Sequence, residues 1–203
     1  MNAEDVATFE RCIAVGGVAL FPADTVYGLA TEPESMEGVG RLYRLKGRRP
    51  DKPAAIMFFR LELALAALPE LPRPTAGAAR ALLPGPVTLL LPNPTHRYPL
   101  ACGPIPDVLG LRVPRLEGEL TALGGVRWPV LQSSANLSEG AEARTIDEVD
   151  EGIRAGVDMI LDGGELPGAP STVVDLSGYH KDGSHPIVRA GAMSAAAIES
   201  ALG

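Results

Sequence analysis

The spacing of apolar residues changes repeatedly along this chain between a helical period and short continuous runs. Val6, Phe9 and Ile13 recur at helical spacing, whereas residues 18–21 and 54–59 are continuous apolar runs typical of buried strands. Helical and strand-like segments alternate in the first half of the chain, and strand-like segments cluster in the second half. This order favours an α/β fold in which helices flank a mixed sheet and polar residues at strand ends line a cleft.

Glycine and proline mark the ends of the remaining segments. We expect helices over residues 4–15, 35–45, 60–68, 75–83, 116–123, 145–155 and 194–202. We expect strands over residues 18–21, 54–59, 87–91, 108–113, 130–134, 157–161, 171–176 and 187–189. No repeat of fixed period and no clear linker divides these segments, so we expect one domain over residues 1–203.

Composition and charge exclude several classes of protein. The two cysteines, Cys12 and Cys102, form no CxxC pair and have no zinc-ligand spacing to the three histidines, which favours a reducing cytoplasm. We expect no signal peptide and no membrane partner, because no basic segment precedes an apolar one at the N-terminus and no apolar run approaches the roughly 20 residues of a membrane span. A net charge of −7 and an aromatic content of 4% argue against a general nucleic-acid-binding protein.

The stretch LFPADTVYGLAT places polar groups directly after a strand-like run. Pro22 cannot donate to a sheet ladder, so we expect the strand to leave regular pairing there. Gly28 would then permit a tight turn or the close approach of a ligand. Between them, Asp24, Thr25 and Tyr27 supply donors and acceptors, either for a ligand or for an Asx-type turn that caps its own backbone.

Basic residues are concentrated in residues 41–52, RLYRLKGRRPDK, which hold six cations and one anion in an otherwise acidic chain. Such a segment suggests a local anionic ligand, for example a phosphate chain. Lys46 and Arg48 are two residues apart and would point the same way on an extended backbone, where a mobile ammonium and a planar guanidinium could both contact phosphate oxygens. For Arg41 and Arg44 we favour the alternative of a solvated helix C-terminus, which cations stabilise.

Two later segments also place polar groups beside strands. Ser134 and Asn136, in LQSSANLS, offer either a hydrogen-bonding rim or a helix N-cap. Ser171 follows GGELPGAP, which mimics a phosphate-binding loop but lacks its lysine, so a Walker-type ATPase is disfavoured. Arg112 and Arg189 each follow apolar strand residues and need anionic partners. Motifs for a covalent nucleophile are absent, so the pattern favours polar recognition and electrostatic catalysis.

Seven segments, taken in order, resemble the YrdC-type family, the threonylcarbamoyl-adenylate synthases of tRNA modification. They are FPADTVYGLA, KGRRPDKPAAI, PGPVTLLLP, LRVP, SSANLSEG, PSTVVDL and VRAG, and the resemblance runs from about residue 8 to 192. It implies a twisted sheet around a large concave cavity. It also implies a reaction that joins L-threonine, bicarbonate and ATP into threonylcarbamoyl-AMP and releases pyrophosphate.

The resemblance also implies roles for particular residues. The family's signature tetrad, which would be catalytic, corresponds to Lys46, Arg48, Ser134 and Asn136. Residues that would contact threonine are Thr25, Arg112 and Ser171, and cations that would face the nucleotide phosphates are Arg48, Lys52 and Arg189. Tyr27 completes the expected substrate-binding set. Mg²⁺ would accompany the triphosphate of ATP without a metal site built from protein carboxylates.

Further implications concern partners and alternatives. Separate proteins would pass the threonylcarbamoyl group to adenosine 37 of tRNA, with weak tRNA contact at most by this chain. The chain departs from the family pattern at Ala23, where threonine is frequent, and at Met57, where histidine is frequent, which leaves amino-acid selectivity open. Its end at Gly203 corresponds to the short family form. The competing interpretations are a noncatalytic RNA-binding module and an enzyme that transfers carbamoyl groups from carbamoyl phosphate.

Overall fold

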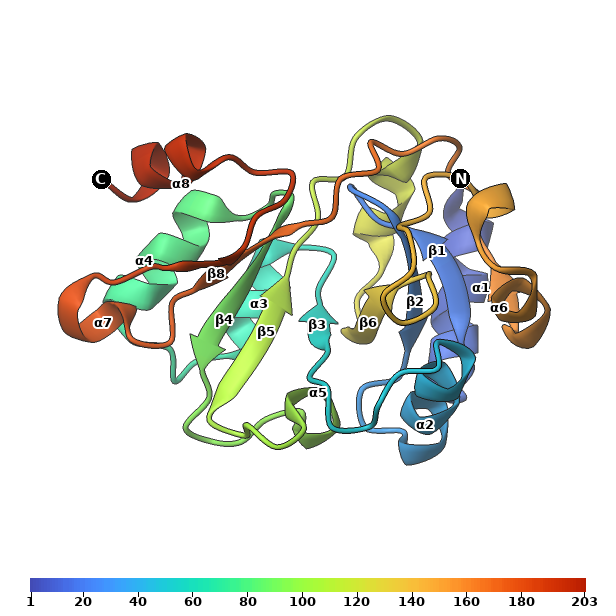
Figure 1. Ribbon diagram of the computed structural model, residues 1–203, viewed down its shortest axis with the longest axis horizontal. Helices are drawn as coiled ribbons and strands as arrows, with labels where there is room; N and C mark the ends of the chain where they lie inside the picture. Colours follow the sequence, from blue (N-terminus) through green and yellow to red (C-terminus); the bar gives the residue numbers. More distant parts are fainter.

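The computed structural model describes residues 1–203 and contains one mixed sheet of nine strands flanked by helices (Figure 1). The strands are β1 (Ala19–Pro22), β2 (Tyr27–Thr31), β3 (Ala55–Met57), β4 (Val87–Pro92), β5 (Val108–Arg112), β6 (Val130–Ser134), β7 (Met159–Ile160), β8 (Thr172–Asp175) and β9 (Ile187–Arg189). Their order across the sheet is β7-β1-β2-β6-β3-β5-β4-β8-β9, with both parallel and antiparallel pairs. The α/β fold class predicted from the sequence is confirmed.

Helices connect the strands and cover parts of both sheet faces. They are α1 (Ala3–Ala14), α2 (Met36–Leu45), α3 (Leu61–Ala67), α4 (Arg73–Leu82), α5 (Pro99–Cys102), α6 (Glu151–Gly156), α7 (Tyr179–Asp182) and α8 (Ala195–Leu202), with 3-10 helices η1 (Gly118–Gly125) and η2 (Ile146–Glu148). In Figure 1, α1, α2 and α6 gather beside β1 and β2, whereas α4, α7 and α8 lie beside β4 and β8. None of these helices is long and apolar enough to cross a bilayer.

Two expected helices differ from the structure for local reasons. The helix expected over residues 116–123 is instead the 3-10 helix η1, and Gly118 at its start has a φ of +55°, outside the α-helical region. The helix expected over residues 145–155 is divided into η2 and α6, because the Asp150 side chain caps a new helix by accepting from Gly152 N and Ile153 N. The four-residue helices α5 and α7 are too short to show a helical period in the sequence.

Strand β2 corrects the interpretation of Gly28. The chain turns between Pro22 and Tyr27, where the amide of Ala23 donates to the carbonyl oxygen of Val26 at 3.3 Å, and then returns antiparallel to β1. Gly28 lies within β2, opposite both Phe21 and Ser134. A Cβ at Gly28 would stand 3.1 Å from the Phe21 ring, so close packing of the sheet, and not a turn, requires glycine here.

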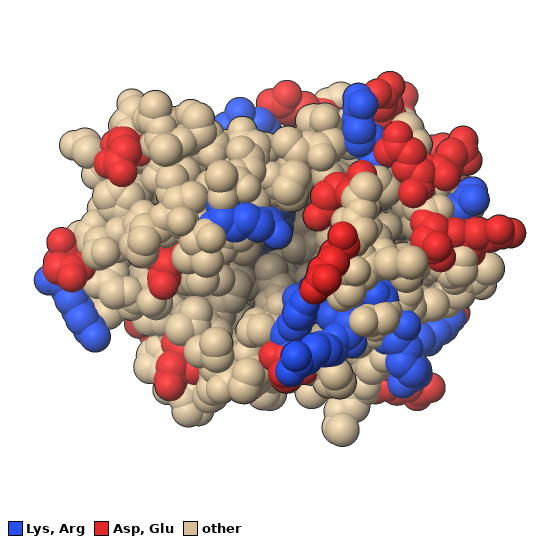
Figure 2. Space-filling view, viewed as in Figure 1, with Lys and Arg blue, Asp and Glu red and all other residues tan.

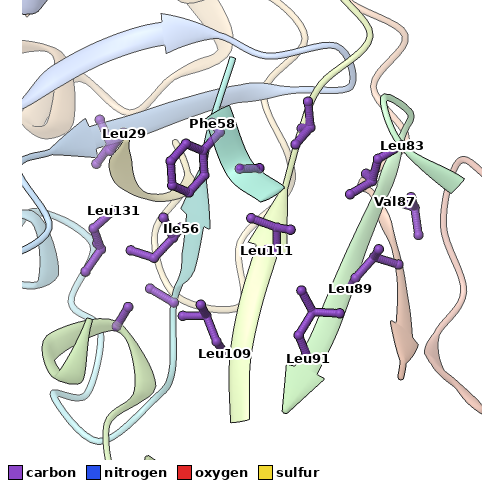
Figure 3. Close-up of a cluster of buried hydrophobic side chains, with 14 of the residues drawn as sticks. Leu29, Ile56, Phe58, Leu83, Val87, Leu89, Leu91, Leu109, Leu111 and Leu131 are labelled. Atoms are coloured by element: carbon purple, nitrogen blue, oxygen red, sulfur yellow. The ribbon is translucent and has the colours of Figure 1, made fainter. Parts of the chain in front are cut away.

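One face of the sheet carries the main hydrophobic core (Figure 3). Every second residue of β4 and β5 points to this face, namely Val87, Leu89, Leu91, Leu109 and Leu111. Each is at most 1% exposed, and helices α2, α3, α4 and α8 supply further side chains to the same cluster. Full burial of such a side chain contributes about 1.5–3 kcal/mol, so the alternation firmly fixes which face of β4 and β5 is left for other contacts.

The opposite face is divided between a second, smaller core and a cavity. Under α1, the rings of Phe9, Phe21 and Phe59 pack with centroid distances of 5.6 to 6.2 Å. Helix α1 contacts β1 and η1, and the second core extends through Met57 and Val130. Beyond Met57, the same face of β5, β4 and β8 lines the cavity. The candidate site is thus continuous with the second core.

Candidate active site

A cavity of about 430 Å³ lies on the face opposite the main core, and the strand register defines its floor. One row of directly paired residues, from β6 through β3 and β5 to β4, consists of Gln132, Ala55, Gly110 and Leu90. The two central residues of this row, Ala55 and Gly110, have little or no side chain and therefore leave space above the sheet. A Cβ at Gly110 would lie 3.4 Å from the Ala55 Cβ. The volume falls in the range of small-molecule sites.

Charged side chains surround this cavity. Those that line it are Arg48, Arg112, Arg189, Glu142 and Asp175. Figure 2 shows a hollow in the middle of this face, with Lys and Arg side chains on both of its sides. The lining carries more positive than negative charge, which favours a ligand with anionic groups.

Lys46 lies at the C-terminal end of α2, and its side chain is directed at the segment that follows β6. The residue is 2% exposed, and its Nζ donates to the carbonyl oxygens of Ser134 and Asn136, the latter at 2.7 Å, and to Asn136 Oδ1 at 3.1 Å. Burial and, to a lesser extent, the Arg48 guanidinium lower the pKa of Lys46 to about 8, while Glu142 acts in the opposite direction. Lys46 therefore lies behind the cavity wall and not on its lining.

Ser134 and Asn136 complete a network with Lys46. Ser134 Oγ donates to Asn136 Oδ1 at 2.6 Å, and Asn136 Nδ2 donates to the carbonyl oxygen of Gly140 at 2.6 Å. Ser134 lines the cavity, whereas Asn136 is outside the lining. Three of the four tetrad residues, Lys46, Ser134 and Asn136, are thus joined in one hydrogen-bond network at the edge of the cavity.

Arg48 reaches the cavity by a route other than the extended backbone that the sequence suggests. Lys46 is in the αR region and Gly47 has a φ of +58°, so the chain turns sharply after α2. The guanidinium of Arg48 then donates to the carbonyl oxygen of Pro53 at 2.5 Å and lies 5.7 Å from the ring centroid of Tyr43. Its buried Nε has no hydrogen-bond acceptor. The residue lines the cavity as expected, and the prediction of an extended backbone was wrong.

Arg112 and Thr25 lie at another part of the lining. Arg112 points from β5 to the cavity and forms a buried ion pair with Asp24, which also accepts from the backbone amide of Arg115 at 2.9 Å. Burial lowers the pKa of Arg112 and Asp24 opposes this shift, so the guanidinium stays charged at neutral pH. The Nε atom of Arg112 is buried without an acceptor. Thr25 is 2% exposed and also lines the cavity.

Ser171 and Arg189 come together through strands β8 and β9. The hydroxyl groups of Ser171 and Thr88 are 2.8 Å apart, and Arg189 Nη2 donates to the Ser171 carbonyl oxygen at 2.8 Å and to its Oγ at 3.3 Å. Thr88 was not identified from the sequence. Its signal is a polar residue at an alternate position of the apolar strand VTLLLP, where Leu89 and Val87 point to the main core.

Besides Lys46 and Asn136, two more expected site residues, Tyr27 and Lys52, lie outside the lining of the cavity. The Tyr27 ring is buried in the main core, and its hydroxyl donates to the Gly164 carbonyl oxygen at 2.9 Å and accepts from Gly163 N at 3.0 Å. Burial raises the pKa of Tyr27 to about 12. Lys52 is 44% exposed and its Nζ lies 3.7 Å from a carboxylate oxygen of Glu139. The polar groups of Tyr27 and Lys52 therefore contact other parts of the protein and do not line the cavity.

The departures from the family pattern differ in position. Ala23 lines the cavity. Met57 is paired with Arg112 in the sheet register and points to the same face, but it is fully buried in the second core. Met57 therefore does not line the cavity, and its effect on Arg112 is through packing in the adjacent second core. Glu142 and Asp175 are further lining residues that were not identified from the sequence, because single carboxylates in loops and at strand ends carry no spacing signal.

Comparison with known proteins gives consistent matches over nearly the whole chain. The sequence matches the Sua5_yciO_yrdC family, described as "Telomere recombination", over residues 11–191. The threonylcarbamoyl-AMP synthase of Pyrococcus abyssi is 30% identical over 192 residues, covering 94% of this chain and 55% of the relative. The protein of the same name from Hahella chejuensis is 34% identical over 167 residues, covering 80% of this chain and 88% of the relative.

Solved structures share the fold. The crystal structure of P. abyssi Sua5 complexed with L-threonine has a TM-score of 0.84 at 28% identity, covering 100% of this chain and 58% of that chain. E. coli YciO, at 22% identity, has a TM-score of 0.77 and covers 97% of this chain and 94% of that chain. This chain spans 55% to 61% of the length of the synthases from P. abyssi, Bos taurus and Homo sapiens. Because the family match extends over residues 11–191 and the Hahella chejuensis relative is matched over 88% of its length, this chain belongs to the Sua5/YciO/YrdC family.

Proposed function

We propose that this chain is an L-threonylcarbamoyladenylate synthase, an enzyme that makes threonylcarbamoyl-AMP and pyrophosphate from L-threonine, bicarbonate and ATP. The observation that carries the proposal is a single cavity lined by Arg48, Ser134, Arg112 and Ser171, with Lys46 bonded directly behind Ser134. The names of the relatives and the L-threonine complex of P. abyssi Sua5 support it.

The lining suggests where each substrate binds. Arg112 has a buried Nε without an acceptor and shares the cavity lining with Thr25 and Ser171, and this guanidinium and the two hydroxyl groups together suit the carboxylate and hydroxyl of threonine. Arg48 and Arg189 are the remaining cations of the lining and suit the phosphates of ATP. Lys52 is not included in this set, because it is outside the lining and its Nζ lies 3.7 Å from a carboxylate oxygen of Glu139.

Catalysis in this proposal depends on holding anions together. The amine of threonine attacks the carbon of bicarbonate, the C–O bond to the hydroxyl of bicarbonate breaks, and a carbamate and water result. An oxygen of the carbamate then attacks the α-phosphorus of ATP, and the bond from that phosphorus to pyrophosphate breaks. The cavity positions the two anionic partners, and Arg48 stabilises charge that develops on the phosphoryl oxygens. Lys46 contributes positive charge and fixes Ser134 and Asn136 in place.

Mg²⁺ enters this scheme with ATP. The cavity lining has two carboxylates, Glu142 and Asp175, and no three His, Cys, Asp or Glu side chains are grouped to hold a metal ion. This composition fits a cation that is bound by triphosphate oxygens and water with little help from the protein. When bound, Mg²⁺ would neutralise part of the triphosphate charge.

The product is a mixed anhydride of a carbamate and AMP, so a second activity must use it promptly. We propose that separate tRNA threonylcarbamoyl-transfer proteins pass the group to adenosine 37 of tRNA, which would place this chain in the cytoplasm. Direct tRNA contact by this chain is not required for the synthase reaction.

A pyrophosphate-release assay tests the proposal. The purified chain is given ATP, Mg²⁺ and bicarbonate with each amino acid in turn, and we expect release that depends on threonine. Lys46→Ala and Arg48→Ala should each reduce the rate by about 10²–10³-fold, because a charge that stabilises the transition state is lost. Lys181→Ala, an exposed cation on α7, is the matched control and should retain the rate. Unchanged rates in both cavity variants, with folding verified by circular dichroism, would refute the proposed roles.

A further inference from the structure

Glu142 is a carboxylate in a cavity otherwise suited to anions. Its side chain lines the cavity, and its Oε2 atom is buried without a hydrogen-bond donor. The other lining carboxylate, Asp175, accepts from the Ser177 amide at 2.8 Å and so has a partner within the protein. A buried carboxylate oxygen that lacks a donor costs free energy, which a ligand that supplies a donor would recover.

Backbone contacts place the segment that carries Glu142 beside the start of β2. The amide of Tyr27 donates to the carbonyl oxygen of Ala143 at 3.0 Å, and the carbonyl oxygen of Tyr27 accepts from Ala135 N at 2.8 Å. The segments that carry Glu142 and Ser134 therefore flank β2 at its first residue. Thr25, proposed to contact the amino acid, lies two residues before that point.

Cations share the cavity lining with this carboxylate. The lining cations are Arg48, Arg112 and Arg189, and Glu142 is also near enough to Lys46 to raise the pKa of its ammonium group. Among the groups of the proposed substrates, the α-ammonium of the amino acid is the one that carries positive charge and several N–H donors. It must also lose a proton before its nitrogen can attack carbon.

We propose that the Glu142 carboxylate binds the α-ammonium group of the amino-acid substrate and accepts a proton from it as the carbamate forms. The inference rests on the proposed synthase function. The ammonium gives one proton to Glu142, and the nitrogen lone pair forms the N–C bond to bicarbonate. The C–O bond to the hydroxyl of bicarbonate breaks, and that hydroxide leaves as water with a second N–H proton. The products are the carbamate, water and a protonated Glu142.

The test starts with the unmodified chain, so that the two proposals can fail separately. If threonine, bicarbonate and ATP yield no pyrophosphate with the unmodified chain, the synthase function itself is refuted and with it the role of Glu142. If the unmodified chain is active, Glu142→Gln is compared with it at pH 7.5. We expect kcat to fall by about 10²-fold or more, the usual contribution of a general base. The KM for threonine should change far less, because the glutamine oxygen still accepts a hydrogen bond.

A substrate with a less basic amine separates proton acceptance from a structural role. In 4,4,4-trifluorothreonine the fluorines lower the pKa of the amine, so a larger fraction is already neutral. The loss of kcat caused by Glu142→Gln should therefore shrink by about tenfold or more with this analogue. Glu151→Gln, at an exposed position on α6, is the matched control and should retain kcat with both substrates.

Three outcomes would overturn the assignment. They are an unchanged kcat in Glu142→Gln, an equal loss with threonine and its fluorinated analogue, and a change confined to the KM for ATP and Mg²⁺. The last of these would identify Glu142 as a contact of the metal–triphosphate complex.

Discussion

Lys46 is a buried cation whose ammonium group donates to three oxygen atoms, one at the last residue of β6 and two at Asn136. An apolar replacement would remove this donor from the carbonyl oxygens of Ser134 and Asn136, at a cost of about 1–3 kcal/mol for each acceptor that stays buried, while Asn136 Oδ1 would keep the Ser134 hydroxyl. The same ammonium group loses hydration on burial, which lowers its pKa to about 8. Function and stability therefore depend on the protonation of Lys46 in different ways.

We expect pyrophosphate release to decrease as pH rises through about 8, since Lys46 loses its charge there. Lys46→Arg should show lower activity, because the guanidinium differs in shape, but its activity should not decrease in that pH range, because arginine stays protonated. The measurement is kcat/KM for threonine from pH 6.5 to 9.5. An identical decrease in Lys46→Arg would assign the titration to another group.

The contribution of Lys46 to stability should change in the opposite direction. Its pKa is lowered from 10.5 in the unfolded chain to about 8 in the folded protein, so between these values the unfolded chain binds more protons. The free energy of unfolding contributed by this group therefore rises with pH from about 8 to 10.5. Urea unfolding at several pH values, compared between the unmodified chain and Lys46→Met, isolates this slope.

At the scale of elements, helix α2 packs on β2 through a glycine. A Cβ at Gly38 would lie 2.3 Å from Thr31 Oγ1 and 2.8 Å from the carbonyl oxygen of Gly16. Alanine is favoured over glycine in a helix by about 1 kcal/mol, yet here the clash outweighs that preference. We expect Gly38→Ala to lower the free energy of unfolding by about 1–3 kcal/mol, the usual cost of overpacking.

Gly40, two residues further along α2, is the matched control. A Cβ there would meet only the flexible end of Arg44, 3.4 Å away. Gly40→Ala should therefore raise the free energy of unfolding by up to about 1 kcal/mol. Urea denaturation with unchanged m-values measures both variants. Stabilisation by Gly38→Ala would show that α2 can move away from β2 at little cost.

The elements that can be predicted from the sequence are those with a periodic apolar pattern. Helices α1 and α2 were predicted within a residue or two because three or four apolar side chains mark one face of each. Strand β2 was missed because its sequence, YGLAT, contains a glycine and follows no clear alternation of apolar and polar residues, and only its pairing with β1 and β6 makes it a strand.

Site residues could be predicted where a charge or a motif marks them. They could not be predicted where the backbone conformation decides which way a side chain points. Arg48 and Ser134 line the cavity as expected, whereas Lys46, the C-cap of α2, keeps an αR backbone and lies behind the cavity wall. Thr88 and Glu142 depend on which face of a strand, or which side of a loop, they occupy. Those facts come from sheet register and long-range hydrogen bonds, which a local pattern does not contain.

At the scale of the whole molecule, most cations of the basic segment 41–52 are paired with carboxylates or turned inward. Its cations have separate partners: Arg41 pairs with Asp158 at 2.6 Å, Arg49 with Asp51 at 2.6 Å, and Lys52 with Glu139 at 3.7 Å. Lys46 is buried and Arg48 faces the cavity, which leaves Arg44 as the cation of this segment with no hydrogen bond or ion pair. This use of the charges argues against the noncatalytic RNA-binding module.

We therefore expect this chain to bind unmodified tRNA weakly, with a Kd near or above about 10⁻⁴ M at physiological salt, the weak end of non-specific binding. The net charge of −7 repels the phosphate backbone, and the basic segment presents too few free cations to offset that repulsion. Arg44→Glu should change this weak affinity by less than about tenfold, as expected for one phosphate contact. Fluorescence anisotropy with labelled tRNA over a salt series measures both proteins. Micromolar affinity that decreases steeply with salt and is lost in Arg44→Glu would show that the surface around α2 is an RNA interface.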